Sequence, residues 1–269
     1  MKKISCALLL LMPAMAFAQL ADSSVRLVRM QGAVNFRDAG GYKTSSGKTV
    51  ITGKVFRSAE VSHLTDQDLR TLEEKHIHTV FDFRGTKEAA AAPDRLLPDT
   101  KYTLCPAGSD SLPNPVQIAV AIKSGNFLEK FYGNVTPLAE RYKPLFQQLL
   151  VLPDNESVMY HCTGGRDRTG MASALFLYAL QVPQDVIEAD FTASNVYLQP
   201  INARMFKGLQ QLTGMTEAEV QDAMALKPAY LRIMFDNLAK SYGSVENFFQ
   251  QGLGIGPDEM KTLRAKYTR

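Results

Sequence analysis

The segment from position 157 to position 180 constrains the fold more than any other part of the chain. Residues 157–160 read as a short buried strand, a loop with two adjacent glycines follows, and residues 170–180 are strongly apolar, as in a buried helix. A buried strand that passes through a tight loop into a buried helix is the unit from which parallel sheets with flanking helices are built. This segment therefore favours an α/β architecture.

Strand-like and helix-like patterns alternate around this segment. Residues 50–56, 79–83 and 102–105 read as strands, and most of the chain after position 183 reads as helix. We therefore predict a central, mostly parallel sheet flanked by helices, with an anion-binding loop between strand and helix and a helical C-terminal part. No linker rich in proline and glycine interrupts residues 19–269, so we predict one domain over this range.

Residues 127–150 also read as helix, but two prolines interrupt the pattern. Pro137 and Pro144 lack the backbone N–H that an interior helical position needs. We expect a break or a turn at each of them.

Residues 1–18 predict a signal peptide. Lys2 and Lys3 precede an apolar stretch, and Ala16-Phe17-Ala18 fits a small-x-small cleavage site. The alternative is a membrane anchor, but the stretch is shorter than the roughly 20 residues that a comfortable span needs. We therefore expect a secreted or periplasmic protein that begins at Gln19, with no later membrane span.

The net charge gives no reason to expect a nucleic-acid partner. The chain carries a formal charge of +3, and removing residues 1–18 takes away Lys2 and Lys3 and no acid, which leaves +1. A near-neutral protein lacks the basic surface with which nucleic acids are bound.

The loop carries the pattern of an anion-binding site. It reads His161-Cys162-Thr163-Gly164-Gly165-Arg166-Asp167-Arg168-Thr169-Gly170, with five residues between the cysteine and the second arginine. This spacing closes a loop whose N–H groups can point inward, and glycine lets the backbone approach a ligand closely. The helix that follows adds unpaired N–H groups and the positive end of its dipole. We predict a phosphate cradle whose binding residues are Thr163, Gly164, Gly165, Arg166 and Thr169.

Cys162 and Arg168 supply the chemistry of phosphoryl transfer. A thiol at a helix N-terminus beside arginines is easily ionised, and the thiolate is a strong nucleophile. The planar fork of arginine can bind two phosphoryl oxygens. We predict that Cys162 attacks phosphorus to form a phosphocysteine, that water releases phosphate, and that the Thr169 hydroxyl hydrogen-bonds the departing sulfur. The scheme needs no metal and no cofactor.

The loop and four other segments resemble the protein tyrosine phosphatase superfamily. Besides the loop, the resemblance covers residues 35–42, 55–59, 81–84 and 242–244, and therefore nearly all of the chain after position 18. It is nearest to the bacterial branch whose loop reads His-Cys-x-x-Gly-Lys-Asp-Arg-Thr-Gly. The resemblance implies a phosphomonoester hydrolase that acts on phosphotyrosine. It extends the candidate substrates to phosphoserine, phosphothreonine and phosphoinositides.

One loop position departs from that branch. Arg166 stands where the branch carries a lysine that, in relatives, is linked to action on phosphoinositides as well as phosphoproteins. Arginine keeps the positive charge but replaces a point charge with a planar fork. The resemblance therefore implies phosphotyrosine activity more directly than lipid phosphatase activity.

Three aspartates are candidates for further roles at the site. The leaving oxygen needs a general acid, and the resemblance gives the acid/base work to Asp167. Asp110, on the loop after the third predicted strand, is the alternative acid. Asp82 ends a predicted strand beside the loop strand, where α/β sheets place their sites. We expect it to order the loop or to contribute to substrate binding; the alternative is an ion pair with Arg84 or Arg57.

Other residues near the loop are expected to support it. Arg37 and Asp38 would brace the N-terminal segment against the loop, and His161 would hydrogen-bond the backbone near the cysteine. Cys105 ends another predicted strand and is either a small buried residue or the partner of Cys162 in a reversible disulfide.

Two other functions remain open for a loop of this shape. One is a phosphate-binding module with weak or no turnover, against which the intact Cys162, Asp167, Arg168 and Thr169 argue. The other is a different thiol enzyme, such as a sulfurtransferase or an arsenate reductase. Arg168-Thr169-Gly170 and the Asn-Phe-Arg-Asp segment at positions 35–38 favour a phosphatase over this second reading.

Overall fold

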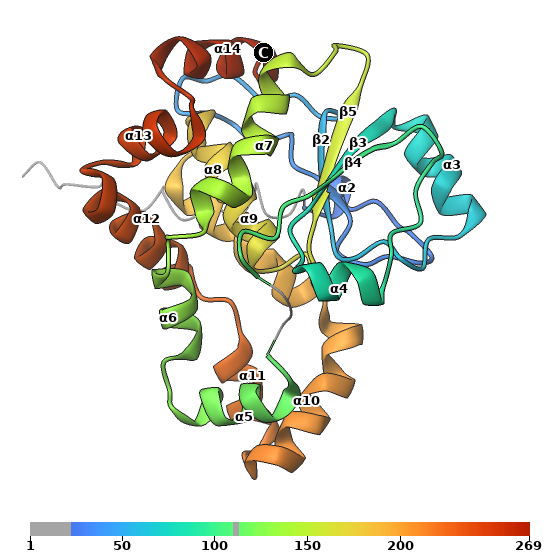
Figure 1. Ribbon diagram of the computed structural model, residues 1–269, viewed down its shortest axis with the longest axis vertical. Coiled ribbons are helices and arrows are strands. Elements are labelled where there is room, and N and C mark those ends of the chain that lie inside the picture. Colours follow the sequence, from blue (N-terminus) through green and yellow to red (C-terminus); the bar gives the residue numbers. More distant parts are fainter. Residues whose placement is uncertain (1–22, 110–112) are drawn as a thin grey trace, which may run out of the picture.

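The computed structural model describes residues 23–109 and 113–269. Within this part, five strands form one sheet at the centre of the molecule (Figure 1). In spatial order the strands are β1 (Arg37–Asp38), β2 (Val55–Ser58), β5 (Ser157–His161), β3 (Ile77–Asp82) and β4 (Lys101–Leu104). β1 is antiparallel to β2, and all other neighbours are parallel. The prediction of a mostly parallel sheet is confirmed.

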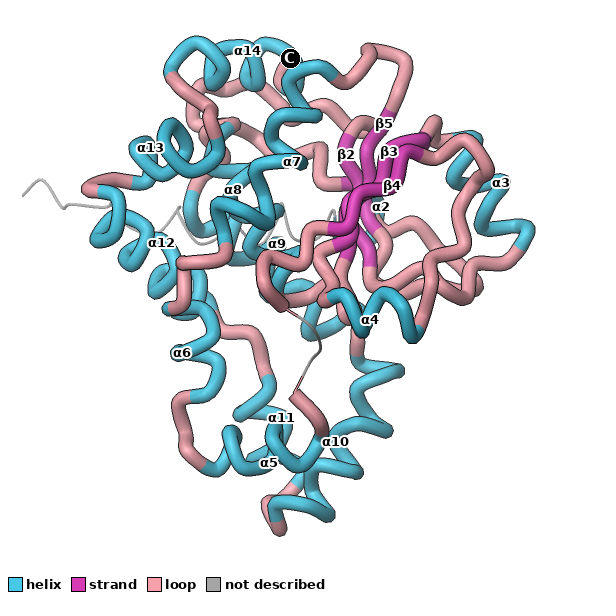
Figure 2. The backbone as a smooth tube through the Cα atoms, in the orientation of Figure 1, coloured by secondary structure: helices cyan, strands magenta, loops and turns pink. Residues whose placement is uncertain are grey.

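Helices flank the sheet and make up most of the remaining described chain (Figure 2). Those before β5 are α2 (Ser23–Arg26), α3 (Asp66–Glu74), α4 (Thr86–Ala91), α5 (Pro115–Lys123), α6 (Phe127–Gly133) and α7 (Leu138–Val151). Those after β5 are α8 (Arg168–Ala179), α9 (Gln184–Tyr197), α10 (Gln199–Thr213), α11 (Glu217–Met224), α12 (Pro228–Tyr242), α13 (Val245–Asn247), the π-helical η1 (Phe248–Leu253) and α14 (Pro257–Tyr267). The predicted helical C-terminal part is therefore confirmed. None of the described helices is long and apolar enough to cross a membrane.

The strands β2, β3 and β5 alternate their apolar side chains between two cores, one on each face of the sheet. In β5, Val158 and Tyr160 enter the larger core and Met159 enters the smaller one. In β3, Phe81 enters the larger core and Val80 enters the smaller one. A parallel strand that is covered on both faces is apolar throughout, which explains why the sequence before the loop shows no polar alternation.

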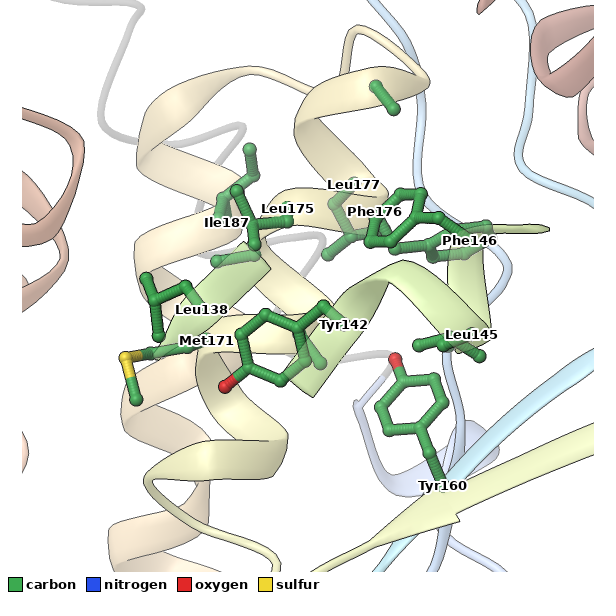
Figure 3. Close-up of a cluster of buried hydrophobic side chains, with 14 of the residues drawn as sticks. Leu138, Tyr142, Leu145, Phe146, Tyr160, Met171, Leu175, Phe176, Leu177 and Ile187 are labelled. Atoms are coloured by element: carbon green, nitrogen blue, oxygen red, sulfur yellow. The ribbon is translucent and has the colours of Figure 1, made fainter. Parts of the chain in front are cut away.

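The larger core packs around α8, the helix that follows the loop. Tyr142 and Leu145 of α7, Leu175 of α8, Ile187 of α9 and Tyr160 of β5 all belong to this core (Figure 3). Every residue of α8 except Tyr178 is buried. A helix buried on all sides is apolar all round, and this is the pattern that the sequence shows after the loop.

Only one of the two expected proline breaks occurs. Pro137 lies directly before α7, but Pro144 lies inside it. The neighbouring Tyr142, Leu145 and Phe146 are fully buried in the larger core. Tertiary packing therefore keeps the helix continuous although a proline N–H is missing, because packing outweighs local propensity.

A helical lobe extends from the sheet and has a small core of its own. α5, α10 and α11 lie at the end of the molecule opposite α14 (Figure 1). Their shared core consists of Ala119, Ile122, Leu209, Val220 and Met224. Because this core is separate from the two beside the sheet, the lobe is held together by its own contacts.

Candidate active site

The predicted loop lies at the carboxyl end of β5, between β2 and β3, the two strands that pair with β5. Ser58 of β2 and Asp82 of β3 both pair with His161, the last residue of β5. Arg168 is the first residue of α8, so the loop passes directly into the helix. The carboxyl ends of parallel strands are where α/β sheets bind ligands.

A cavity of about 640 Å³ opens onto the loop. The loop residues that line it are Cys162, Thr163, Gly164, Arg166, Asp167 and Arg168. Apolar side chains of the helices line it as well, among them Ile118, Phe131, Ile201, Met205 and Met224. The cavity thus combines a charged, nucleophilic part with an apolar wall to which the helical lobe contributes.

Gly165 belongs to the loop but does not line the cavity. Its φ is +59°, and a Cβ at this position would lie 2.3 Å from the carbonyl oxygen of Ser58, so only glycine fits. The carbonyl oxygen of Gly165 accepts hydrogen bonds from Asn35 Nδ2 and Arg57 Nη2, each at 2.9 Å. Gly165 therefore acts as the point where the sheet holds the loop.

Glu88 of α4, which we did not predict, orients Arg168. Its Oε2 and Oε1 accept from Arg168 Nη1 and Nη2 at 2.8 and 2.9 Å, and Phe83 O accepts from Nη1 at 3.0 Å. Thr163 Oγ1 donates to Glu88 Oε1 at 2.6 Å. Burial would raise the pKa of Glu88, but the hydrogen bonds and charge of Arg168 outweigh it and hold this pKa low. A two-pronged pair of this kind fixes the plane of the guanidinium.

The sequence around Glu88 predicts the start of a helix and gives no sign of a role at the active site. Its Oε2 accepts from the backbone N–H of Gly85 at 2.7 Å, as the third residue of a capping box does. Nothing in that local pattern predicts that the same carboxylate reaches the loop.

Both carboxylate oxygens of Asp167 are engaged. Tyr132 of α6 donates its hydroxyl to Oδ1 at 2.7 Å, and Arg166 Nε donates to Oδ2 at 3.0 Å. Arg166 also donates through Nη1 to Met224 O at 3.0 Å. Burial would raise the pKa of Asp167, but the charge of Arg166, these two hydrogen bonds and the charge of Arg168 outweigh it and lower this pKa. The candidate acid/base residue is therefore an ionised carboxylate in this arrangement.

Asp190 of α9, also not predicted, joins two buried arginines behind the loop. It accepts from Arg37 Nε at 3.2 Å, from Arg57 Nη1 at 2.7 Å and from the Tyr42 hydroxyl at 2.9 Å. Burial would raise the pKa of Asp190, but Arg37 and Arg57 outweigh it and hold this pKa far below its usual range. Arg37 therefore braces the loop through Asp190 and Arg57. The other brace that we predicted, Asp38, instead accepts from the N–H groups of Gly40 and Gly53.

Asp82 forms a buried ion pair and does not line the cavity. Its carboxylate accepts from Arg84 Nη2 at 2.7 Å and from the Tyr102 hydroxyl at 2.8 Å. Its side chain has no exposed surface. The structure thus places Asp82 in the ion pair with Arg84 that was the alternative to a role in substrate binding.

His161 lies between the buried carboxylates on this side of the loop and the backbone of Cys162. Its Nε2 lies 2.8 Å from Asp94 Oδ2, and its Nδ1 faces the carbonyl oxygen of Cys162 at 3.3 Å, as we expected. Asp82, Asp94 and His161 place their donor atoms within 4.8 Å of one another. Arg84 Nη2 also lies 2.7 Å from Asp94, so a guanidinium already supplies the positive charge between the two carboxylates.

The structure forms no hydrogen bond between Thr169 and the Cys162 sulfur, and of the two alternatives for Cys105 it shows the small buried residue. Thr169 Oγ1 is buried and has no hydrogen-bond partner within the described residues, so the predicted bond to the Cys162 sulfur is missing. Cys105 and Cys162 are both free and buried. Burial raises the pKa of the Cys105 thiol to about 12, which makes it a poor nucleophile at neutral pH. Asp110, the alternative acid, lies outside the described residues.

The Asp190 cluster predicts a strong dependence of stability on charge. We expect Asp190→Asn to lower the free energy of unfolding at pH 7 by about 3–5 kcal/mol, because two buried arginines lose their counter-charge. The pKa of Asp190 is lowered on folding, so its contribution is present above its unfolded value of about 3.9 and is lost as the pH falls below it. Urea unfolding at several pH values should therefore show the variant and the wild type converging in acid.

The matched control is Asp258→Asn. Asp258 has an 88% exposed side chain and pairs with Lys261 on the same helix, so the change should stay within about 0.5 kcal/mol. An Asp190→Asn effect as small as that of the control would contradict the role assigned to Asp190.

Comparisons with known proteins agree with this geometry. A sequence profile described as the tyrosine phosphatase family matches residues 28–269. The triple specificity protein phosphatase PtpB of Mycobacterium tuberculosis is 26% identical over an alignment of 271 residues. The alignment covers 87% of this chain and 96% of that protein. A Cupriavidus necator protein named as a tyrosine-protein phosphatase is 26% identical over 239 residues, 87% of this chain and 85% of its own. The crystal structure of P. aeruginosa TpbA aligns over 66% of this chain and 89% of its own, at 14% identity and with a TM-score of 0.33. The profile spans the sheet, the loop and the helical lobe, and it establishes that this chain belongs to the tyrosine phosphatase family.

Proposed function

We propose that the protein hydrolyses phosphotyrosine, with Cys162 as the nucleophile. One observation carries the proposal: Cys162, the oriented Arg168 and the N-terminus of α8 face one cavity with an apolar wall. Membership of the tyrosine phosphatase family supports the same activity. A phosphate-binding module is less well supported, because it has no use for the Cys162 thiol that lines the cavity. Membership of the tyrosine phosphatase family argues against a sulfurtransferase.

The reaction proceeds by two displacements at phosphorus. The phosphoryl group binds to the loop amides and to Arg168, which stabilise the charge on its oxygens in the transition state. The sulfur of Cys162 attacks phosphorus, and the electron pair of the broken P–O bond leaves on the oxygen of the leaving group. Water then attacks the phosphocysteine, and the electron pair of the P–S bond returns to sulfur as phosphate is released.

The wall of the cavity suits an aromatic phosphate ester. The tyrosyl ring can pack against apolar side chains such as Phe131 and Ile201 while the phosphoryl group lies on the loop. Phosphoserine, phosphothreonine and phosphoinositides are secondary candidates. Arg166, at the position where relatives carry lysine, is tied to Asp167 and Met224 O, and this contact argues against its service as a free cation for an inositol headgroup.

We also propose that the protein is exported. The support is the pattern of residues 1–18, which lie outside the described part of the chain. Mass spectrometry of the protein from fractionated cells should find it in the periplasm or the medium with Gln19 at its N-terminus. An uncleaved chain in the cytosol would rule export out.

The direct test of the activity is phosphate release from a phosphotyrosine peptide in the presence of a reductant and EDTA. We expect turnover by the wild type that EDTA does not diminish, because the scheme uses no metal. Cys162→Ser should lose about 10⁴-fold or more, as expected when a nucleophile is removed. Equal activity of the two proteins would show that Cys162 is not the nucleophile. Turnover of thiosulfate without release of phosphate would favour the sulfurtransferase.

The contact between Glu88 and Arg168 predicts a large kinetic effect from a small change. Glu88→Gln keeps the size of the side chain but removes the charge that fixes the guanidinium. We expect kcat/KM for the phosphotyrosine peptide to fall about 10²-fold, since a displacement of a binding group by about 1 Å can cost that much. Glu74→Gln, at an exposed position at the end of α3, is the control and should match the wild type. If Glu88→Gln also matches it, Glu88 does not orient Arg168.

A further inference from the structure

The cavity is lined by segments from before β1 and after β2 as well as by the helices. Residues 31–34, Ala59, Glu60 and His63 belong to this part of the lining. Among them Glu60 carries the one carboxylate, and 32% of its side chain is exposed. A ligand that lies on the loop can therefore reach this carboxylate from the cavity.

Backbone hydrogen bonds hold Glu60 beside the loop. The N–H of Ala59 donates to the carbonyl oxygen of Val34 at 3.1 Å, and the N–H of Glu60 donates to the carbonyl oxygen of Thr163 at 3.0 Å. Thr163 directly follows the nucleophile Cys162 in the sequence. The base of the Glu60 side chain is thus fixed one hydrogen bond away from the loop, which limits how far its carboxylate can lie from a bound phosphoryl group.

Arg84, the cation that contacts Glu60, is already occupied. Oε2 of Glu60 lies 3.5 Å from Arg84 Nη1. Asp82 and Asp94 hold the same guanidinium more closely, each at 2.7 Å from its Nη2. Three carboxylates therefore share one guanidinium, and Glu60 makes the longest contact of the three. The imidazole of His161, 2.8 Å from Asp94, can balance one of the other two at most.

The other carboxylates at the loop each have an arginine of their own. Arg166 Nε lies 3.0 Å from Asp167, and Arg168 Nη1 lies 2.8 Å from Glu88. Of the three acids Glu60, Asp167 and Glu88, Glu60 is therefore the one whose charge is least neutralised. It is also the one that a cation brought by a ligand can neutralise further.

We propose that Glu60 is a specificity-determining residue that binds a cationic side chain, lysine or arginine, next to the phosphorylated residue of a peptide substrate. This inference rests on the function proposed above and adds to it which peptides the site selects. The phosphoryl group lies on the loop, and the ammonium or guanidinium group of the neighbouring residue lies against Glu60. The two opposite charges of the substrate thus meet the two opposite charges of the site.

The contact selects substrates without taking part in the making or breaking of bonds. A partly buried carboxylate binds a cation more strongly than a fully exposed one, because less water screens the pair. The pair is the same in the ground state and in the transition state, so it should lower KM and leave kcat nearly unchanged. An acidic residue at the same place in the peptide would meet a like charge and bind less well.

The test compares phosphotyrosine peptides that differ at one residue. Peptides with lysine, glutamine or glutamate directly before or directly after the phosphotyrosine would be hydrolysed by the wild type and by Glu60→Gln. On at least one of the two sides we expect the wild type to favour lysine over glutamine by about tenfold in kcat/KM, through KM, as one charge-assisted hydrogen bond can supply. The preference should weaken as salt is raised and should vanish in Glu60→Gln.

Two further variants separate a direct contact from a change in overall charge. Glu60→Lys should reverse the order and favour the glutamate peptide. Asp66→Asn is the matched control, because it removes the same charge from an aspartate at the start of α3 that is 77% exposed and pairs with Arg95, outside the described lining of the cavity. The control should keep the wild-type ratio of the lysine and glutamine peptides.

Equal kcat/KM of the wild type for the lysine and glutamine peptides on both sides would overturn the proposal. A lysine preference that survives in Glu60→Gln would overturn it as well. So would a loss of kcat for all peptides together with an unchanged ratio, because that is what a purely structural role of Glu60 predicts. Should Glu60→Lys fail to fold, the ratio in Glu60→Gln decides.

Failure of the proposed function would look different. In that case the wild type would hydrolyse none of the phosphotyrosine peptides, or Cys162→Ser would hydrolyse them as well as the wild type does. Failure of the inference about Glu60 leaves hydrolysis by the wild type and its dependence on Cys162 intact, and removes only the preference among the peptides.

Discussion

The loop keeps its shape because a buried carboxylate neutralises the arginines that hold it. Arg57 reaches the carbonyl oxygen of Gly165 from β2 and has no exposed surface. A buried guanidinium without a counter-charge would be strongly unfavourable, and Asp190 provides that charge to both Arg57 and Arg37. These contacts, from Asp190 of α9 through Arg57 of β2 to Gly165, link the helical layer, the sheet and the loop.

Carboxylates also fix a guanidinium and an imidazole on the other sides of the loop. Glu88 orients Arg168 from α4, and Asp94 holds His161, whose other ring nitrogen faces the backbone of Cys162. The helical lobe and α6 contribute the apolar wall and the contacts of Asp167. Donors and charges that are in place before the substrate binds need no reorganisation during the reaction, and this is the main source of catalytic power in sites of this kind.

The parts that could be predicted from sequence are those in which the signal is local. The loop is contiguous, so Cys162 and Arg168 reveal its chemistry by their spacing, and the apolar strand before it predicts a parallel sheet. Glu88 and Asp190 could not be found in this way, because they lie 80 and 22 residues from Arg168 and only the packing of α4 and α9 brings them to the loop. For Asp82 the position at a strand end left two roles open, one at the site and one in an ion pair with Arg84 or Arg57, and only the packed structure places it against Arg84.

Transfer of the phosphoryl group to Cys162 can be observed by trapping the intermediate. The wild-type protein would be mixed with an aryl phosphate, quenched within milliseconds, digested and examined by mass spectrometry. We expect one phosphoryl group on the peptide that contains Cys162, with its amount falling as the reaction ends. A phosphoryl group on another residue, or turnover without any phosphorylated peptide, would contradict this expectation.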